Sequence, residues 1–418
     1  VYKSNPICIS KAEGVFLYDQ AGRRYLDFSA QFSAAAIGHG HPKMLQNLKN
    51  ALDELVGINP MFVTEPRAVL AQRLISLLPD CFGKCLFGCT GSDANEFALK
   101  VAKVVKGGGK IFSFWRGYHG ATAGAAGASA KAETIQTNRS IQELIPQGFI
   151  HASPPYCYRC DFKTNYPTCD LLCLHYLERQ IRLEGPSNVA AIILEPIIAG
   201  GGVITPPPGY LKRLRELCDQ YEILLILDEV VTGFGRTGSM FAFEQEDIVP
   251  DILVLGKALT GGYIPGSATI VKSEFAELMD QLHLHGHTHS GYPLMCIAGL
   301  TTLDIMVEER LVERSRQMGE LLGEGLCELS NRYSFIGDVR GRGLLYGIDI
   351  ISDPVQKEPN YNLTQKLTDA LLKEGLVVEP EINRVLGSSI LVLHPPLTVT
   401  ESDIFAAVDL LDKVFSTV

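Results

Sequence analysis

The sequence predicts an α/β protein with a large domain, whose mostly parallel sheet is covered by helices, plus a smaller α+β domain built from both chain termini. Short, continuously apolar runs recur through the middle of the chain with helical segments between them, which is typical of parallel strands buried on both faces. The two ends of the 418-residue chain instead combine a hairpin pattern with long helical stretches and late strands. We place the large domain at residues 56–295, and the two parts of the small domain at residues 1–55 and 296–418.

The first element expected is a small β-hairpin or meander at residues 13–27, where apolar stretches flank a polar turn that contains Gly22. Strands of the large sheet are expected at the apolar runs 84–88, 110–115, 189–194, 223–227 and 252–255. Between the third and fourth runs, a crossover helix is predicted from helically spaced apolar residues, which are Leu211, Leu214, Leu217, Cys218 and Tyr221. After about His289 long helical stretches follow, with strands at 337–350 and 389–393.

The composition favours a soluble enzyme. Lys and Arg number 37 against 47 Asp and Glu, a net charge of −10, which argues against nucleic acid or an anionic membrane as a partner. No apolar run approaches the roughly 18 residues of a membrane span, and no signal peptide is evident. The 11 cysteines are scattered and odd in number, so we expect reduced thiols and a cytoplasmic location.

Ionisable residues end three consecutive strands of the predicted sheet. Glu195 ends the run 189–194, Asp228 the next run, and Lys257 the one after. Each could be a solvated strand terminus, but parallel sheets collect ligands at their carboxyl edges, so we expect the three to converge. A lysine that forms a Schiff base with an aldehyde, and an aspartate that keeps a pyridine nitrogen protonated, are the groups that a pyridoxal 5'-phosphate (PLP) enzyme needs.

Two further segments suit the same edge. Gly91 and Ser92 open a helix directly after a strand, where free backbone N–H groups and the helix dipole favour a phosphate. The Walker and Rossmann glycine patterns are missing, and a capped helix start without a ligand is the alternative. Tyr118 follows the strand that ends at Trp115 and could stack on a flat cofactor, although an ordinary loop tyrosine would look the same.

These motifs resemble the class III aminotransferases, which are PLP enzymes of fold type I. The segments that carry the resemblance are residues 91–96, 118–120, 195–196, 228–238, 250–257 and 287–293, extended by Asp27 with residues 38–42 and by residues 339–344. Because they are long and in order, the resemblance covers nearly the whole chain.

The resemblance implies a role for each residue. Lys257 would form the Schiff base and shuttle protons, Asp228 would hold the pyridine nitrogen, and Tyr118 would stack on the ring. Gly91 and Ser92 would hold the phosphate with help from the partner's Thr288, so the resemblance implies a homodimer with shared sites, and a tetramer stays open. The cofactor-binding set that it implies is Gly91, Ser92, Tyr118, His119, Glu195, Asp228, Val231, Lys257 and Thr288.

The sequence departs from many of these relatives at two positions. An arginine that grips the substrate α-carboxylate is replaced by Val392, and a glutamate that pairs with it is replaced by Gly200. Joint loss avoids an unpaired buried charge and resembles the ω-transaminases. We therefore expect ping-pong transamination from an amine or ω-amino acid to a keto acid such as pyruvate. Arg384 is the candidate cation for the keto acid, or else a solvated loop residue.

Other functions stay open at this point. A class III relative could instead be an amino-acid racemase or epimerase, a decarboxylase or a phospho-amine lyase, because all begin with the same PLP–substrate adduct. A non-catalytic scaffold of the same fold is opposed by the presence of both Lys257 and Asp228.

Two groups of residues have a metal-like pattern, but we predict no metal. Cys157 and Cys160 have zinc-like spacing, yet Cys169 and Cys173 follow so soon that unpaired loop thiols are favoured. A histidine tract flanks Thr288, which already has an expected role, and its members are His283, His285, His287 and His289.

Overall fold

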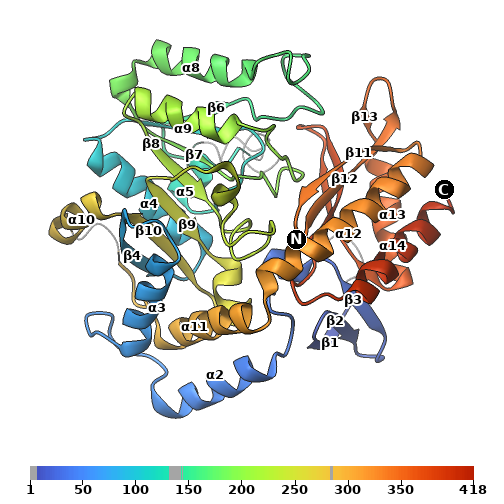
Figure 1. Cartoon of the computed structure of the whole chain (residues 1–418), viewed down its shortest axis with the longest axis horizontal. Helices are drawn as coiled ribbons and strands as arrows, with labels where there is room; N and C mark the ends of the chain where they lie inside the picture. The colour runs from blue at the N-terminus through green and yellow to red at the C-terminus, as the bar shows by residue number, and fades with distance from the viewer. Residues whose placement is uncertain (1–6, 131–142, 144, 283–285) are drawn as a thin grey trace.

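The computed structural model describes residues 7–130, 143, 145–282 and 286–418. A seven-stranded β-sheet lies in the left half of Figure 1. In order across the sheet, its strands are β4 (Phe82–Gly88), β10 (Ser267–Lys272), β9 (Ile252–Leu255), β8 (Leu224–Asp228), β7 (Val189–Leu194), β5 (Lys110–Phe114) and β6 (Phe149–Ala152). All neighbours from β9 to β6 are parallel, whereas β10 is antiparallel to both of its neighbours. The predicted mostly parallel sheet is therefore confirmed.

Two strands of this sheet were not among the predicted runs. Strand β6 is short and contains His151, and β10 begins with small and polar residues. Ser267 and Thr269 in β10 are nevertheless buried, and the Thr269 hydroxyl donates a hydrogen bond to the Ala94 carbonyl at 2.7 Å. Because that hydroxyl is satisfied on a neighbouring helix, a polar residue occupies a core strand without an unpaired group.

Helices pack against the large sheet. Helix α4 (Gly91–Val105) packs along β4 and β7 to β10, while α9 (Tyr210–Gln220) packs on β8 and confirms the predicted crossover helix. Below the sheet in Figure 1, α11 (Pro293–Glu308) contacts α2 (Pro42–Glu54) and α3 (Glu65–Ser76). The other helices of this part are α1 (Ala30–Ser33), α5 (Ala123–Ala128), α8 (Leu172–Glu184) and α10 (Ala276–Leu282).

The two ends of the chain meet in a second sheet. The meander of β1 (Ile9–Glu13), β2 (Phe16–Asp19) and β3 (Arg24–Asp27) is antiparallel, and β14 (Leu376–Val377) then joins β3 in parallel. A third sheet consists of β11 (Ile336–Arg342), β12 (Leu345–Asp353), β13 (Glu358–Pro359), β15 (Glu379–Asn383) and β16 (Ser388–Leu393). It lies with α12 (Leu311–Arg332), α13 (Tyr361–Glu374) and α14 (Glu401–Phe415) on the right of Figure 1. The predicted meander and late strands are confirmed, whereas the domain boundaries stay a prediction.

Continuous burial explains why the central strands were predictable. Every residue of β7, β8 and β9 is buried, as expected for strands covered on both faces. Since these three strands run parallel side by side, the residues at their carboxyl ends reach one edge of the sheet. Within the part of the chain that the structure describes, we find no helix whose length and apolar character would let it cross a bilayer.

Candidate active site

The predicted site residues meet at the carboxyl edge of the large sheet. Glu195 directly follows β7, Asp228 is the last residue of β8, and Lys257 follows β9 at the start of a short 3-10 helix, η3 (Lys257–Thr260). These three residues line one cavity of about 180 Å³. The other predicted residues in its lining are Gly91, Ser92, Tyr118, His119 and Val231.

Asp228 is held by a buried hydrogen-bond network. Its Oδ2 atom accepts hydrogen bonds from His119 Nδ1 and Asn95 Nδ2, both at 2.8 Å, and its Oδ1 atom accepts one from the Val230 N–H at 3.1 Å. Asn95 also donates to the His119 carbonyl at 2.7 Å. Three donors on one buried carboxylate fix its orientation. Asn95 was missed by the sequence analysis, because its position on the first turns of α4 reads only as helix.

Lys257 is half-buried, and three carboxylates act on its amine. Burial lowers the pKa of Lys257, and the negative charges of Glu195, Glu379 and Asp228 oppose that shift. A depressed pKa makes the neutral amine, which is the nucleophilic form, more accessible. The backbone of Lys257 has a φ of 44°, in the left-handed region that non-glycine residues rarely adopt, as is frequent at functional sites.

Glu195 joins two loops at the rim of the cavity. Its two carboxylate oxygens accept hydrogen bonds from the backbone N–H groups of Tyr118 and Ala199, each at 3.0 Å. Burial raises the pKa of Glu195, and the nearby Asp228 charge raises it further. Glu195 therefore positions Tyr118, whose side chain is half exposed and lines the cavity.

The start of α4 forms one end of the cavity, called here the phosphate-type end because its backbone N–H groups could bind a phosphate. Thr90 caps the helix in a capping box with Asp93, so Gly91 and Ser92 occupy the first turn, where backbone N–H groups have no partner within the helix. A Cβ atom on Gly91 would lie 3.2 Å from the Val230 methyl groups, so the close approach suits glycine. The Ser92 hydroxyl accepts a hydrogen bond from the Ala121 N–H at 3.1 Å. This geometry suits an anion at the helix N-terminus.

The residue after Asp228, Glu229, forms hydrogen bonds with residues further along the chain. The buried Glu229 carboxylate accepts hydrogen bonds from the N–H groups of Ala242 and Phe243 and from the Thr232 hydroxyl. Burial raises the pKa of Glu229 to about 7, and these donors oppose the shift. Such a network is structural, because Glu229 lines neither cavity described here.

A second cavity, of about 550 Å³, adjoins the first and shares Lys257 and Tyr118 with it. Gly200 and Val392, the two positions where the sequence departs from many relatives, both line this cavity. Val392 lies on β16 and packs in an apolar cluster with Ala199. The wall at these positions is therefore apolar and carries no charge.

A polar group that the sequence pattern did not reveal lies next to this wall, since Glu379 is the cross-strand partner of Val392 and His394 follows Val392 by two residues. His394 is buried. Its Nδ1 atom lies 2.8 Å from Ser33 Oγ, and its Nε2 atom lies 2.8 Å from Glu379 Oε2. Burial lowers the pKa of His394, and Glu379 opposes that shift. Glu381, two residues further along β15, lines the same cavity. The signal was the alternation of Glu379 and Glu381 along a strand.

Two predicted residues lie elsewhere. Among the residues that the structure describes, the lining of the two cavities includes neither Thr288 nor Arg384. Thr288 is exposed on a turn, so its role toward a partner subunit stays a prediction. Arg384 is exposed, and its guanidinium carbon lies 4.7 Å from the centre of the Tyr361 ring. Its position in this chain does not bring it to the keto-acid site for which it was proposed.

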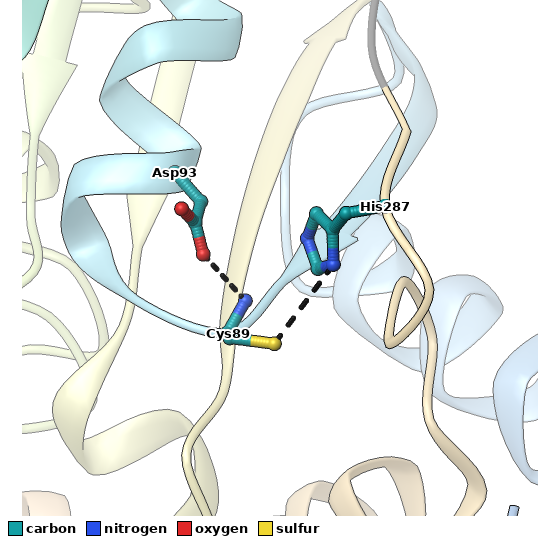
Figure 2. A group of neighbouring side chains, drawn as sticks. All are labelled: Cys89, Asp93 and His287. Atoms are coloured by element: carbon teal, nitrogen blue, oxygen red, sulfur yellow. Dashed lines mark hydrogen bonds between the residues drawn. The ribbon is translucent and has the colours of Figure 1, made fainter. Parts of the chain in front are cut away.

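Part of the histidine tract lies beside the phosphate-type end. Figure 2 shows His287 facing Cys89, with Nδ1 at 4.0 Å from the sulfur, and Asp93 nearby. The Asp93 carboxylate, however, already accepts the N–H groups of Cys89 and Thr90 in the capping box. Helix capping therefore accounts for the Asp93 carboxylate. His283 and His285 lie outside the described residues.

The sequence matches the family described as aminotransferase class-III over residues 1–415. The chain belongs to the class III aminotransferases. This aminotransferase is 34% identical to an uncharacterized aminotransferase, YhxA, of Bacillus subtilis, over 100% of this chain and 93% of that protein. It is 32% identical to a leucine/methionine racemase of Thermococcus litoralis, over 99% of this chain and 91% of that protein.

A solved structure confirms the fold of this class III aminotransferase. An amine transaminase from an uncultivated Pseudomonas species, in its PLP-bound form, matches with a TM-score of 0.93 and 32% identity, over 99% of this chain and 95% of that one. The predicted PLP fold type I is therefore confirmed. Family membership and this PLP-bound neighbour imply PLP as the cofactor.

Proposed function

We propose that this aminotransferase binds PLP in the smaller cavity and transfers an amino group from an amine or ω-amino acid to a keto acid such as pyruvate. The observation that carries the proposal is the uncharged wall formed by Gly200 and Val392 beside Lys257. An α-carboxylate would be buried there without a cation, which is costly, so donors that lack a carboxylate next to the amine are favoured.

The residues of the smaller cavity fit PLP. Asp228 offers a carboxylate held by three donors, and the start of α4 offers N–H groups for a phosphate. Within the described part of the chain, the buried His119 Nε2 atom has no hydrogen-bond partner, so a polar cofactor can satisfy it. When bound, PLP supplies an electron sink for the reacting carbon of the donor.

Each side chain has a definite task in this proposal. Lys257 Nζ would hold the cofactor through its aldehyde group and, once the donor amine has taken that place, would act as the base that removes the proton from the donor carbon. Asp228 Oδ1 or Oδ2 keeps a proton on the ring nitrogen, while His119 and Asn95 hold the carboxylate in place. Tyr118 covers one face of the site and limits water. Donor and acceptor use the same cavity in turn, so the kinetics should be ping-pong.

We also propose that two chains form a dimer in which the partner's Thr288 completes the phosphate site, and that the enzyme is cytoplasmic. The exposure of Thr288 in one chain supports the first point. The keto acid still needs a cation, and we keep Arg384 as the candidate, which requires that it leaves Tyr361 when the acceptor binds.

A racemase is the second candidate, because the relative from Thermococcus litoralis carries that name. Racemisation needs proton transfer at the α-carbon of an amino acid, but no net consumption of a keto acid. The apolar wall at Gly200 and Val392 disfavours it, since an α-carboxylate would have to face that wall.

The decisive experiment supplies the PLP-loaded enzyme with pyruvate and a panel of donors that includes primary amines, ω-amino acids and α-amino acids, and measures alanine. Alanine formed from an amine or ω-amino acid, with parallel double-reciprocal plots, is the expected result. Interconversion of amino-acid enantiomers without loss of keto acid would instead establish the racemase. Borohydride reduction followed by peptide mapping should locate the cofactor on Lys257.

A further inference from the structure

Four cysteines gather in the loop between β6 and α8. Cys157, Cys160, Cys169 and Cys173 are all free thiols, and all four line one small cavity of about 20 Å³. The short spacing between the two pairs favours unpaired loop thiols when only the sequence is considered. The structure shows that the chain folds back on itself within this short distance, so the two pairs face a common space.

The loop that carries the thiols is long and irregular. Residues 153–171 contain no helix or strand, although a loop of more than about 12–15 residues without secondary structure is uncommon unless it has a function or a cross-link. The backbone of Lys163, Asp170 and Leu171 lies in the left-handed region, with φ values of 52°, 44° and 55°. A cross-link at the centre of the loop would compensate for this strained backbone.

We propose that Cys157, Cys160, Cys169 and Cys173 bind one Zn²⁺ ion. Four thiolates exclude hard cations such as Mg²⁺ and Ca²⁺, and a tetrahedral set of four sulfurs is typical of structural zinc. Among the described residues, Cys89, Asp93 and His287 form the group whose ligand atoms all lie within 4.8 Å of one another. The four cysteine sulfurs are not such a group, so they surround their cavity at longer distances from one another. Zinc would draw them inward, to Zn–S distances of about 2.3 Å.

The surroundings of the sulfurs support this site. The Cys160 sulfur accepts backbone hydrogen bonds from Phe162 and Thr164, and the Thr164 hydroxyl lies 3.6 Å from it. Backbone N–H groups directed at a sulfur stabilise a thiolate, which is the form that binds zinc.

The proposed site would anchor a contact that leads toward the active site. Arg159, between Cys157 and Cys160, donates two hydrogen bonds to the buried Asp349 carboxylate at 2.7 and 2.6 Å. Asp349 lies on β12, where Arg340 also contacts it and donates to the Gly202 carbonyl at 2.6 Å. Gly202 is two residues from Gly200, which lines both cavities. Zinc would therefore stiffen the loop that follows β6 of the large sheet and contacts the third sheet through Arg159.

The test measures zinc in the purified PLP-loaded full-length enzyme by plasma mass spectrometry. We expect about one zinc per chain in the parent and a fall to background in Cys160→Ser and Cys173→Ser. Cys327→Ser, an exposed cysteine on α12, is the matched control and should keep its zinc. The PLP absorbance of each variant, recorded in parallel, separates loss of the metal from loss of the fold.

A second measurement uses the parent enzyme alone, in case the variants do not fold. Displacing zinc with a thiol-specific mercurial in the presence of a metal-sensitive dye should release one equivalent, and Co²⁺ exchanged into the site should show the visible bands of a tetrahedral thiolate complex. A reduced enzyme that contains no zinc after incubation with Zn²⁺ would overturn the proposal. Iron with acid-labile sulfide, or a mass four hydrogens lower that indicates two disulfides, would also overturn it.

Discussion

The Nδ1 atom of His119 lies 2.8 Å from the Oδ2 atom of Asp228, and both side chains are almost completely buried. A carboxylate accepts but does not donate, so His119 carries its proton on Nδ1 and presents an unpartnered Nε2 atom on the other side, within the part of the chain described. Asn95 donates to the same oxygen. Asp228 is thus supported by groups from two other segments of the chain.

Replacing Asp228 with Asn should lower kcat by roughly 100-fold or more, because a neutral amide cannot hold a positive charge on the ring nitrogen. Asp219→Asn, at an exposed position on α9, is the control. Single-turnover rates with the best donor would measure the effect, together with the melting temperature. Normal turnover by Asp228→Asn would show that Asp228 does not have the assigned role.

Lys257→Ala should abolish turnover while leaving the fold intact. The side chain provides the nucleophile and the proton carrier, and the loss of an aliphatic stem costs little packing. Lys212→Ala on α9 provides an exposed control. Steady-state assays and circular dichroism would check both parts, and residual activity above about 1% of the parent would count against a direct role.

Val392→Arg should increase kcat/KM for substrates with an α-carboxylate relative to those without one, by about 10-fold or more. The guanidinium would enter the wall of the larger cavity and provide the cation that this wall lacks. Val392→Met fills similar space without charge and should leave the ratio unchanged. The ratio is measured with an α-amino acid and its decarboxylated amine.

Arg384→Ala should raise the KM for the keto acid about 10-fold and leave the KM of an uncharged donor unchanged, if Arg384 moves to the acceptor. Arg310→Ala, at an exposed position before α12, is the control. Equal effects on donor and acceptor would indicate that Arg384 only stabilises the β15–β16 turn against Tyr361.

Glu229 should make the enzyme less stable as the pH rises. Its folded pKa is raised to about 7 from an ordinary value of 4.5. The stabilisation is therefore complete below pH 4.5 and is lost as the pH passes through about 7, by roughly 1–3 kcal/mol. Denaturant unfolding between pH 5 and pH 8 would measure the slope of the free energy of unfolding against pH, and Glu229→Gln should remove this slope. An unchanged slope in that variant would assign it to another group.

The strands and charged groups of the large sheet were predictable from the sequence for one physical reason. Parallel strands buried on both faces have continuous apolar runs, and the residues that end them must share an edge, so Glu195, Asp228 and Lys257 could be brought together without a structure. Asn95, Ser33 and Glu379 could not, because their roles depend on contacts between segments far apart in the chain. The fold of the cysteine loop was equally hidden, since its backbone turns follow no periodic pattern.

The pairing of β3 with β14 has a consequence for how the protein is made. The strand that β3 needs as a neighbour lies about 350 residues later, so during translation the first strands emerge long before the ribosome has delivered their partner. The seven-stranded sheet, complete by Lys272, can form while that edge of the N-terminal sheet is still open. Chaperone demand should therefore be greatest late in synthesis, until the last third of the polypeptide closes the open edge.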